Sequence, residues 1–491
     1  MFGRSQPPRV PTDDVLPARF FDDSPVVKAV VMRWMVRFDD VFDAEHLRRS
    51  LARLLEMGSW RRLGGRFRLN KQGKLEIHVP KVFSTERPAI RFSRIQFEYN
   101  ISEHPLASRL PRPTEGPSIQ EGGDVFRDLL TNRRWKFPKT LEDYLYSDEP
   151  PIALQVLGFK DATIVSLNFP HALTDAVGLS ALITNWCRVL AGREDQVLPL
   201  PTVDPMETIS QQADQPEEEH VLKTKKLVGF GLMMFVSHFV WDLLFGPKME
   251  TRTIFLPPKS FTVLKQRATA EFQTGSDKAE PFISEGDVLT AWGTKMVALG
   301  LGPRFTRTMA VMNVFELRGR LKNCFDLSGY AYVQNAFFTL NTILTARDAR
   351  EQGIGQIALR LRNTLVEQTT EPQIRALVRE QRASLTESGR PTLFAEPDSI
   401  LVPFTNWNKA RFFEVVDFSP AVRTPGNLKG TKGGRVGKPA LFLSFDSNPK
   451  PNPTYRNVFN ILGKDPEGNY WITGMLSRAT WDGIEKELKS L

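Results

Sequence analysis

The chain contains little cysteine and little histidine: two cysteines and six histidines among 491 residues. Cys187 and Cys324 form no CxxC pair and lie at no His/Cys spacing suited to zinc, so we expect neither a disulfide framework nor a structural metal. The start, MFGRSQPPRVPTDD, has proline and charge where a signal peptide needs an apolar core. These absences predict a cytoplasmic protein without a metal site.

Motifs of several enzyme classes are also missing. The sequence has no GxSxG nucleophile elbow, no HExxH and no GxGxxG. GTKGGRVGKP, residues 430–439, resembles a phosphate loop in composition, but it lacks the first glycine of a Walker motif and has Pro439 where Ser or Thr is required. The net charge is +9, yet no dense basic run or nucleic-acid-binding motif accompanies it, so no nucleic acid partner is expected.

The length predicts two domains, because 491 residues exceed what one hydrophobic core usually supports. The best linker candidate is the polar, proline-bearing stretch that follows residue 192. We therefore expect an N-terminal domain over residues 1–195, a crossover linker over residues 196–226 and a C-terminal domain over residues 227–491.

Hydrophobic periodicity predicts a mixed α/β fold. An amphipathic helix should follow the N-cap candidate Asp43 and stop at Gly58, and a hairpin should turn at residues 70–73. A buried strand is expected over residues 162–169, followed by a helix that ends at Gly192. In the second half, Ser284 is a candidate N-cap, and residues 331–341 and 438–446 read as strands, before a final strand and helix.

Residues 227–245, LVGFGLMMFVSHFVWDLLF, form the most apolar run of the chain and are flanked by lysines. The run is long enough in principle to span a bilayer, but it contains His238 and Asp242. Three interpretations stay open at this point: a helix packed on its own domain, a helix lying on a membrane surface, or a span.

The pattern His171-Ala-Leu-Thr-Asp175 lies in the predicted connection between that strand and helix, beside Gly178. A free imidazole titrates near neutral pH and can accept a proton from an alcohol. Asp175 could hydrogen-bond the imidazole or turn away and anchor the loop through an arginine, and spacing alone does not choose. His238 and Asp242 match the same pattern within the apolar run, where a core or membrane-edge pair is expected. His171 itself could be a base or a core imidazole.

A cationic, glycine-rich stretch near the end of the chain has two interpretations. It contains Arg423, Lys429, Lys432, Arg435 and Lys438 without an acidic residue among them. Such a loop could bind the phosphates of a carrier such as coenzyme A, or it could be a solvated surface loop.

The residues taken together resemble the BAHD-type acyl-CoA-dependent acyltransferases, especially the fungal branch that looks like trichothecene 3-O-acetyltransferase. The similarity covers nearly the whole chain. It rests on the helix and GR hairpin near the start, on LNFPHALTDAVGLSALITNW, and on ISEGDVLTAW, VFELRGRL, YVQNAFF and PFTNWNKARFFEVVDF in the second half. The implied fold is a two-domain, chloramphenicol-acetyltransferase-like α/β fold, with mixed sheets flanked by helices and a channel between the lobes.

The resemblance also implies roles for particular residues. His171 would be the general base that deprotonates the acceptor, and Asp175 would point away from the channel and pair with Arg318, supported by Gly178. Thr405 and Trp407 would line the reaction centre and steady the oxyanion. Lys432, Arg435 and Lys438 are the candidate contacts for the phosphates of acyl-CoA.

Two departures from the family pattern stand out. The family's DFGWG motif appears as Asp417-Phe418-Ser419-Pro420-Ala421, followed by the glycine- and lysine-rich insertion, which questions the geometry on the coenzyme A side. Pro170 stands where many relatives carry a second histidine, which fits a mechanism with one base.

The resulting expectation is an acyl-CoA-dependent O-acyltransferase, an acetyltransferase that acts on a hydroxyl of a hydrophobic terpenoid or polyketide. Acyl-CoA would be a co-substrate and no cofactor would stay bound. We also expect a monomer. Peripheral membrane contact through residues 227–245 is one of the interpretations left open above. The alternatives are intramolecular acyl transfer or cyclisation on a carrier-bound substrate, and a non-catalytic small-molecule-binding protein.

Overall fold

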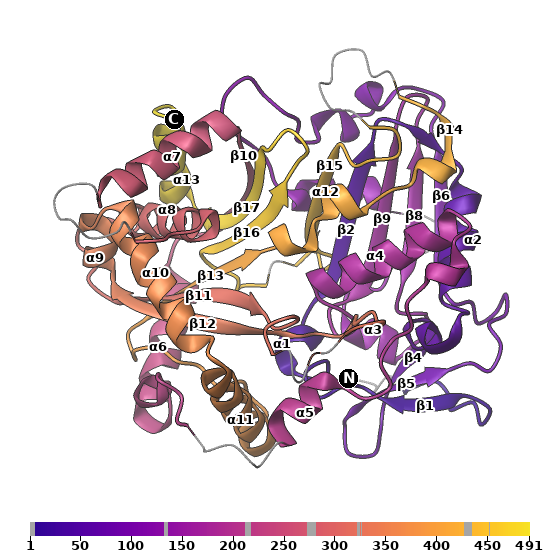
Figure 1. Cartoon of the computed structure of the whole chain (residues 1–491), viewed down its shortest axis with the longest axis horizontal. Coiled ribbons are helices and arrows are strands. Elements are labelled where there is room, and N and C mark those ends of the chain that lie inside the picture. Colours follow the sequence, from indigo (N-terminus) through magenta and orange to yellow (C-terminus); the bar gives the residue numbers. More distant parts are fainter. Residues whose placement is uncertain are drawn as a thin grey trace.

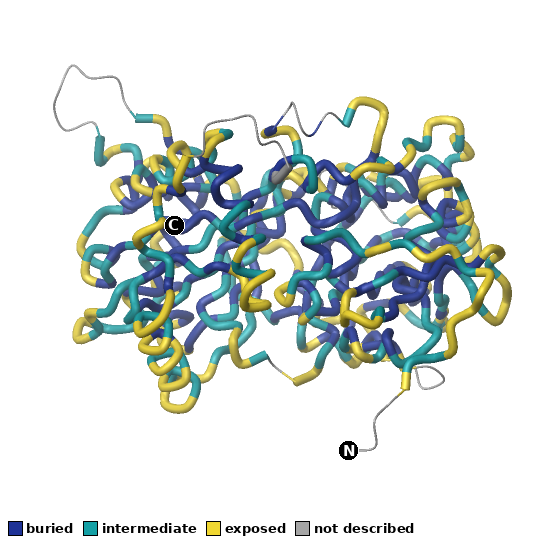
Figure 2. The backbone as a smooth tube through the Cα atoms, turned by 90° about the horizontal axis from the view of Figure 1, so that it is seen from below, coloured by how far each residue is buried: buried dark blue, intermediate teal, exposed yellow. Residues whose placement is uncertain are grey.

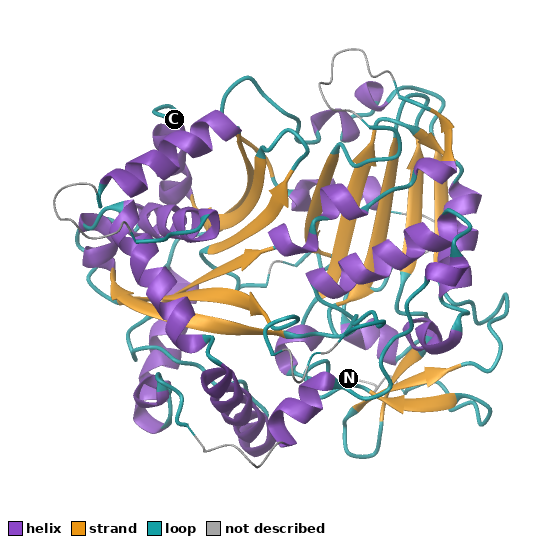
Figure 3. Cartoon of the chain, in the orientation of Figure 1, coloured by secondary structure: helices purple, strands orange, loops and turns teal. Residues whose placement is uncertain are grey.

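The computed structural model describes residues 5–131, 136–211, 218–272, 281–321, 325, 327–426, 435–450 and 452–491. Its strands form two large sheets, one in each half of the molecule, with helices packed on them (Figure 3). Buried residues run through the interior of both halves, and exposed residues lie along the outer surface (Figure 2). The fold is thus a mixed α/β fold, as the sequence predicts.

The first large sheet has five strands in the order β15-β2-β9-β8-β6. Only the pair β6 and β8 is parallel. The central strands are buried on both faces, which explains why β9 reads as a continuous apolar run. Its strands are β15 (Leu441–Asp446), β2 (Val31–Phe38), β9 (Thr163–Pro170), β8 (Ala153–Gly158) and β6 (Arg91–Gln96).

The second large sheet has seven strands in the order β12-β11-β13-β16-β17-β10-β7. The pairs β11 with β13 and β13 with β16 are parallel, and the other pairs are antiparallel. Its strands are β12 (Phe337–Thr345), β11 (Thr308–Glu316), β13 (Ile400–Asn406), β16 (Val458–Lys464), β17 (Tyr470–Ser477), β10 (Met249–Leu256) and β7 (Ser118–Glu121).

The two halves exchange one strand each. β7 comes from the first half of the chain but pairs with β10 in the seven-stranded sheet. β15 comes from near the end of the chain but pairs with β2 at the edge of the five-stranded sheet. Each sheet therefore needs a segment from the other half of the chain, and the division at residues 196–226 stays a prediction.

Smaller elements surround the first sheet. A three-stranded sheet contains β1 (Asp14–Pro17), β5 (Leu75–Val79) and β4 (Arg66–Leu69), and a pair joins β3 (Val41–Phe42) to β14 (Val422–Thr424). The helices α2 (Ala44–Leu54) and α4 (Ala176–Leu190) pack together, and α4 runs across one face of the sheet (Figure 1). Short helices are α1 (Pro25–Lys28), α3 (Leu141–Leu145), α5 (Pro205–Gln211) and α12 (Phe412–Val415).

Longer helices accompany the second sheet. In particular, α8 packs against α10 and α13, and their apolar side chains share one core with the sheet. The helices of this half are α6 (Gly229–Phe245), α7 (Pro258–Ala270), α8 (Glu285–Gly300), α9 (Ala346–Glu351), α10 (Ile354–Gln368), α11 (Glu371–Ser388) and α13 (Arg478–Leu488).

Several local predictions are confirmed. The carboxylate of Asp43 accepts hydrogen bonds from the first turn of α2, and Ser284 forms a capping box at α8. The hairpin of β4 and β5 turns where expected, with Gly73 at φ +73°. Gly58 does not end α2. The helix stops at Leu54, where the N–H of the C-cap Leu55 donates to the carbonyls of Leu51 and Arg53, and a separate 3-10 helix begins at Gly58.

Two of the predicted strands begin several residues later than expected. β12 begins at Phe337, because residues 331–336 run as a loop whose backbone contacts the other half of the molecule. β15 begins at Leu441, three residues later than expected. Before β12, the backbone N–H groups of Ala331, Asn335 and Ala336 donate to acceptors outside the sheet. Before β15, Lys438 and Pro439 are poor strand formers, and proline has no backbone N–H to donate.

The apolar run forms α6, which begins at Gly229 and lies at the lower left edge of the molecule, outside the seven-stranded sheet (Figure 1). None of the helices in the described part of the chain combines the length and the apolarity that crossing a membrane requires.

Candidate active site

His171 lies in the tight connection between β9 and α4. β9 ends at Pro170, which pairs with Val31, and the backbone N–H of His171 donates to the carbonyl of Val30 at 2.9 Å. The next turn is closed by hydrogen bonds from Leu173 to Pro170 and from Thr174 to His171. The histidine backbone is therefore fixed by the first sheet.

The imidazole of His171 is half-buried and lies 5.7 Å from the ring of Phe337, centroid to centroid. Burial lowers its pKa below the ordinary value of 6.5. Three groups raise the pKa of the ring again, but by less than burial lowers it. They are the backbone carbonyl of His171, the carboxylate of Asp175 and the amide of Asn335. The ring is therefore neutral at physiological pH, the form that can accept a proton.

Asp175 is the N-cap of α4 and binds donors from both halves of the molecule. Its Oδ1 accepts from the backbone N–H of Gly178 at 2.8 Å. Its Oδ2 accepts from the backbone N–H of Ala336 at 2.9 Å and from both terminal nitrogens of Arg318 at 3.1 Å. The carboxylate thus anchors the loop that carries His171 to the second half of the chain.

The side chain of Arg318 is buried, and its guanidinium is held from several sides. Besides Asp175, it donates to the carbonyl of Gln334 and to Glu316, and it lies over the ring of Tyr332 at 5.1 Å. Burial alone would lower the pKa of Arg318, but the carboxylates of Asp175 and Glu316 outweigh it and raise the pKa. The guanidinium of Arg318 stays protonated.

Gly178 permits the two halves to approach closely. A Cβ atom at this position would lie 2.2 Å from the carbonyl oxygen of Val333 and 2.4 Å from Oγ1 of Thr174. Any side chain would push α4 away from residues 331–336. The glycine therefore serves packing and not a turn.

Asn335 and Asp22 belong to the site but were not predicted from the sequence. The side-chain amide of Asn335 donates to the carbonyl of His171 at 2.9 Å and to Oδ1 of Asp22 at 2.7 Å, and its backbone N–H donates to the same Oδ1 at 2.9 Å. Burial raises the pKa of Asp22 to about 7, which the Asn335 hydrogen bonds offset only in part. Asp22 and Asn335 lie 313 residues apart, so no local pattern joins them.

Thr405 and Trp407 lie at the end of β13 and beyond it. The hydroxyl of Thr405 donates to Oδ1 of Asn460 at 2.8 Å, and the backbone N–H of Trp407 donates to the carbonyl of Ile461. The indole packs on Phe412 at 6.1 Å. Both side chains are half-buried, and their role at the reaction centre stays a prediction.

The three predicted phosphate contacts have different positions. Lys432 lies outside the described residues, and Arg435 is exposed. The ammonium group of Lys438 donates to the carbonyl of Glu414 at 3.0 Å and lies 3.3 Å from Asp417. A phosphate would therefore compete with Asp417 for Lys438.

The altered DFGWG region is a packing element. Phe418 is buried against Phe38, Phe42 and Trp186, and its backbone N–H donates to the carbonyl of Gly437. The substitution of the motif thus leaves its aromatic anchor in place.

The second HxxxD pattern has a different environment. Asp242 forms a two-point ion pair with Arg307 at 2.8 and 3.0 Å. His238 is half-buried on α6. The Asp242–Arg307 ion pair attaches α6 to the protein and is not part of the connection between β9 and α4.

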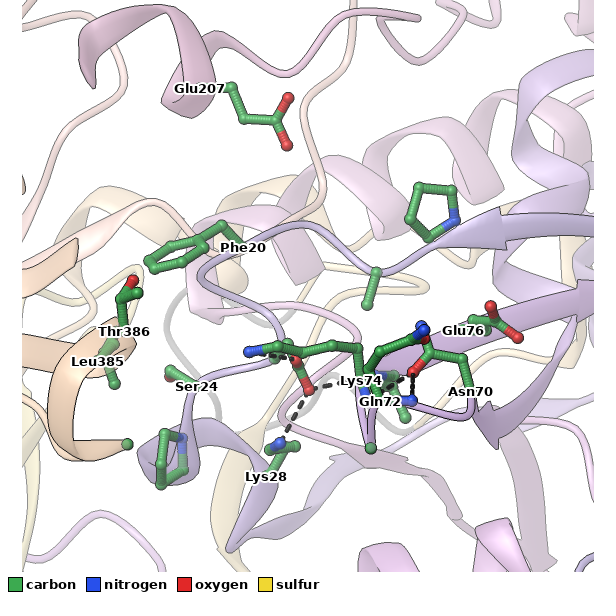
Figure 4. Close-up of a pocket in the computed structure, with 17 residues that line it drawn as sticks. Phe20, Ser24, Lys28, Asn70, Gln72, Lys74, Glu76, Glu207, Leu385 and Thr386 are labelled. Carbon is green, nitrogen blue, oxygen red and sulfur yellow. Dashed lines mark hydrogen bonds and ion pairs between the residues drawn. The ribbon is translucent and has the colours of Figure 1, made fainter. Parts of the chain in front are cut away.

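A cavity of about 470 Å³ lies beside the N-terminal segment (Figure 4). Its wall includes Phe20, Lys28, the turn of the β4–β5 hairpin, Glu207 and the end of α11. Lys28 is ion-paired with Asp23 at 2.8 Å, and His171 is not part of the wall. The charged lining does not match a hydrophobic alcohol, so we do not assign the acceptor to it.

Comparisons with known proteins agree with this architecture. Residues 136–419 match the Transferase family. O-acetyltransferase PaAT-2 of Phomopsis amygdali is 38% identical, over 98% of this chain and 99% of the relative. Acetyltransferase BOT5 of Botryotinia fuckeliana is 37% identical, over 97% of this chain and 91% of the relative.

Two solved structures share the fold. TRI101 of F. sporotrichioides, complexed with coenzyme A and T-2, has a TM-score of 0.65 at 16% identity, with 97% of both chains covered. Vinorine synthase has a TM-score of 0.55 at 13% identity, with 99% of this chain and 95% of that chain covered. The chain belongs to the Transferase family of BAHD-type acyltransferases and is an acyltransferase.

Breaking the Asp175–Arg318 ion pair should reduce both stability and activity. Asp175→Asn places an amide against Arg318 and Ala336, and Arg318→Ala leaves the carboxylate buried and unpaired. Each should lower the free energy of unfolding by about 3–5 kcal/mol. Thermal melting and thiol release from acetyl-CoA would be measured together.

Asp242→Asn is the matched control, because it breaks the ion pair of the other HxxxD pattern at a partly exposed position. It should cost about 1 kcal/mol or less and leave activity in place. An Asp175→Asn enzyme that is inactive but melts like the parent would contradict the anchoring role.

The acid limb of kcat/KM should have its midpoint below pH 6.5, because burial lowers the pKa of His171. Below that midpoint the ring is protonated and kcat/KM should fall about tenfold per pH unit. A pH-rate profile, with folding monitored over the same range, checks this. A midpoint above pH 6.5 would refute it.

Asp22→Ala should lower the free energy of unfolding by about 1–3 kcal/mol, because it leaves the two N–H groups of Asn335 without their acceptor. Asp22→Asn retains an acceptor. The carboxyl of Asp22 contributes stability below its unfolded pKa near 3.8, and this contribution is lost as the pH rises to about 7. The melting temperature of Asp22→Asn relative to the parent should therefore increase between pH 5 and pH 8, whereas a constant difference would count against the raised pKa.

Proposed function

We propose that this enzyme is an acyl-CoA-dependent O-acyltransferase that transfers an acetyl group to a hydroxyl of a hydrophobic specialised metabolite, a terpenoid or a polyketide. The observation that carries the proposal is the neutral imidazole of His171 on a loop anchored by the Asp175–Arg318 pair. Two findings support the donor and the kind of acceptor. The relatives are named as acetyltransferases, and the TRI101 structure is a complex with coenzyme A and T-2.

In the proposed reaction His171 is the general base. Its free nitrogen removes the proton of the acceptor hydroxyl while the oxygen attacks the thioester carbonyl. The tetrahedral intermediate collapses, the C–S bond breaks, and the leaving thiolate takes the proton back from the imidazolium. A positioned base contributes about 10²- to 10⁴-fold, and the gathering of both substrates contributes further.

Asp175 supports this reaction by position. Both of its oxygens already accept hydrogen bonds from Gly178, Ala336 and Arg318, so it keeps the loop in place and has little capacity left for the imidazole. We infer that the low pKa of His171 is set by burial, and that Asp175 determines where the base stands.

The oxyanion and the phosphates are assigned to the remaining predicted residues. Thr405 would donate to the oxyanion after its hydroxyl rotates away from Asn460, and the indole N–H of Trp407 would be the second donor. Arg435, Lys438 and Lys432 would bind the phosphates of acyl-CoA in a channel between the two halves. The same proposal includes a monomeric enzyme.

His171→Ala should lower acceptor-dependent release of thiol from acetyl-CoA by about 10²- to 10⁴-fold. The protein is incubated with acetyl-CoA and a panel of terpenoid and polyketide alcohols, and free thiol and product mass are followed. His238→Ala, which removes the histidine of the other HxxxD pattern, should keep full activity.

The remaining outcomes separate the alternatives. Equal activity of His171→Ala and the parent would refute the assigned base. Binding of acceptors without turnover across a broad panel would favour a binding protein, and product without loss of an external acyl donor would favour intramolecular acyl transfer.

A further inference from the structure

Helix α6 exposes an unusually apolar surface. Of its 17 residues, Gly229–Phe245, only Phe235 is buried. The largest exposed fractions belong to Phe230 (69%), Met233 (58%), Trp241 (63%), Leu244 (70%) and Phe245 (67%). A soluble protein rarely leaves so many large apolar side chains together in water without a binding partner.

The exposed side chains form one continuous stripe. They recur at spacings of three and four residues along the helix, and Met234, Val240 and Ser237 lie on the same side. The outer stripe is the set of exposed side chains of α6: Phe230, Met233, Met234, Val236, Ser237, Val240, Trp241, Leu244 and Phe245. The rings of Trp241 and Phe245 are 4.4 Å apart, so the C-terminal end of the stripe presents an aromatic pair.

The opposite side of α6 is attached to the protein, which keeps the outer stripe pointing outward. Phe235 belongs to a small core with Ala310 and Ala395, against which Leu232 and Phe239 also pack. Asp242 is fixed by its two-point ion pair with Arg307. The helix therefore cannot turn its apolar surface inward without breaking these contacts.

The charges around the outer stripe favour an anionic partner. Within α6 the ionisable groups are His238 and Asp242, and Asp242 is neutralised by Arg307. At the C-terminal end Lys248 is exposed, and Arg456 donates to the carbonyl of Pro247. The nearby Glu250 is already paired with Arg252. Cations therefore outnumber carboxylates beside the aromatic pair.

The size of the stripe argues against a second protein chain as the partner. A helix of 17 residues is ~25 Å long, so one face about 10 Å wide offers roughly 250 Å². A stable protein interface needs about 800 Å² from each partner. A membrane surface requires no matching shape, and exposed Trp and Phe next to Lys and Arg are typical of helices that lie in the headgroup region.

We propose that the outer stripe of α6 binds the enzyme peripherally to the surface of an anionic lipid membrane, with the helix lying in the plane of the bilayer. The aromatic pair enters the headgroup region, and Lys248 and Arg456 contact lipid phosphates. This binding does not depend on His171 or on the proposed acyl transfer.

The test is flotation of the full chain with vesicles of phosphatidylcholine, with and without phosphatidylserine. The parent should float with the anionic vesicles and bind the neutral ones more weakly. Trp241→Ser combined with Phe245→Ser should lower binding to the anionic vesicles at least tenfold, because the burial of both rings is lost. Phe282→Ser, at an aromatic residue that is equally exposed but outside α6, should bind like the parent.

Two controls make the result decisive. The melting temperature and the thiol release without vesicles should be the same in the parent and in the double variant, because the substituted side chains face solvent. Failure of the parent to float, or equal flotation of the double variant, would overturn the proposal. A parent that is dimeric in sedimentation velocity, with a monomeric double variant, would also overturn it, since a second copy would then be the partner.

Discussion

The carboxylate of Asp175 is the interaction on which the site depends. It caps α4 through Gly178, accepts the backbone N–H of Ala336 at the start of the second sheet, and pairs with Arg318. One of these donors belongs to the first half of the chain and two to the second. The contacts that join the two halves are therefore the same contacts that position the loop with His171. The close approach of α4 to Val333 at Gly178 is one of them.

This arrangement separates what sets the pKa of the His171 imidazole from what sets its position. The pKa of His171 is set mainly by removal of the ring from water. The backbone N–H of His171 is held by Val30, which precedes β2, and its carbonyl is held by Asn335 from the second half. Asn335 is in turn fixed by the buried Asp22, so a residue close to the N-terminus takes part in orienting the loop.

Patterns within the sequence predict what is local and miss what is distant, and the Asp175–Arg318 pair, 143 residues apart, was expected only from the family resemblance. Three local features were predicted correctly, because each depends on residues only a few positions apart. They are the N-cap at Asp43, the cap at Ser284 and the β4–β5 hairpin. The Asp22–Asn335 contact was not, although Asn335 stands in a recognisable stretch, because its partner is 313 residues away. The outward side of α6 could not be read either, since a helix that is apolar all round has no periodic signal to show which side is covered.

The exchange of β7 and β15 has a consequence for how the protein is made. β2 leaves the ribosome about 400 residues before β15, the strand that covers its edge. Until then the edge of β2 in the nascent first sheet is unpaired, although the side chains of this strand are largely buried in the finished protein. Unpaired strand edges of this kind pair with other chains or bind chaperones. The first sheet is therefore completed late in biosynthesis, only after β15 has emerged.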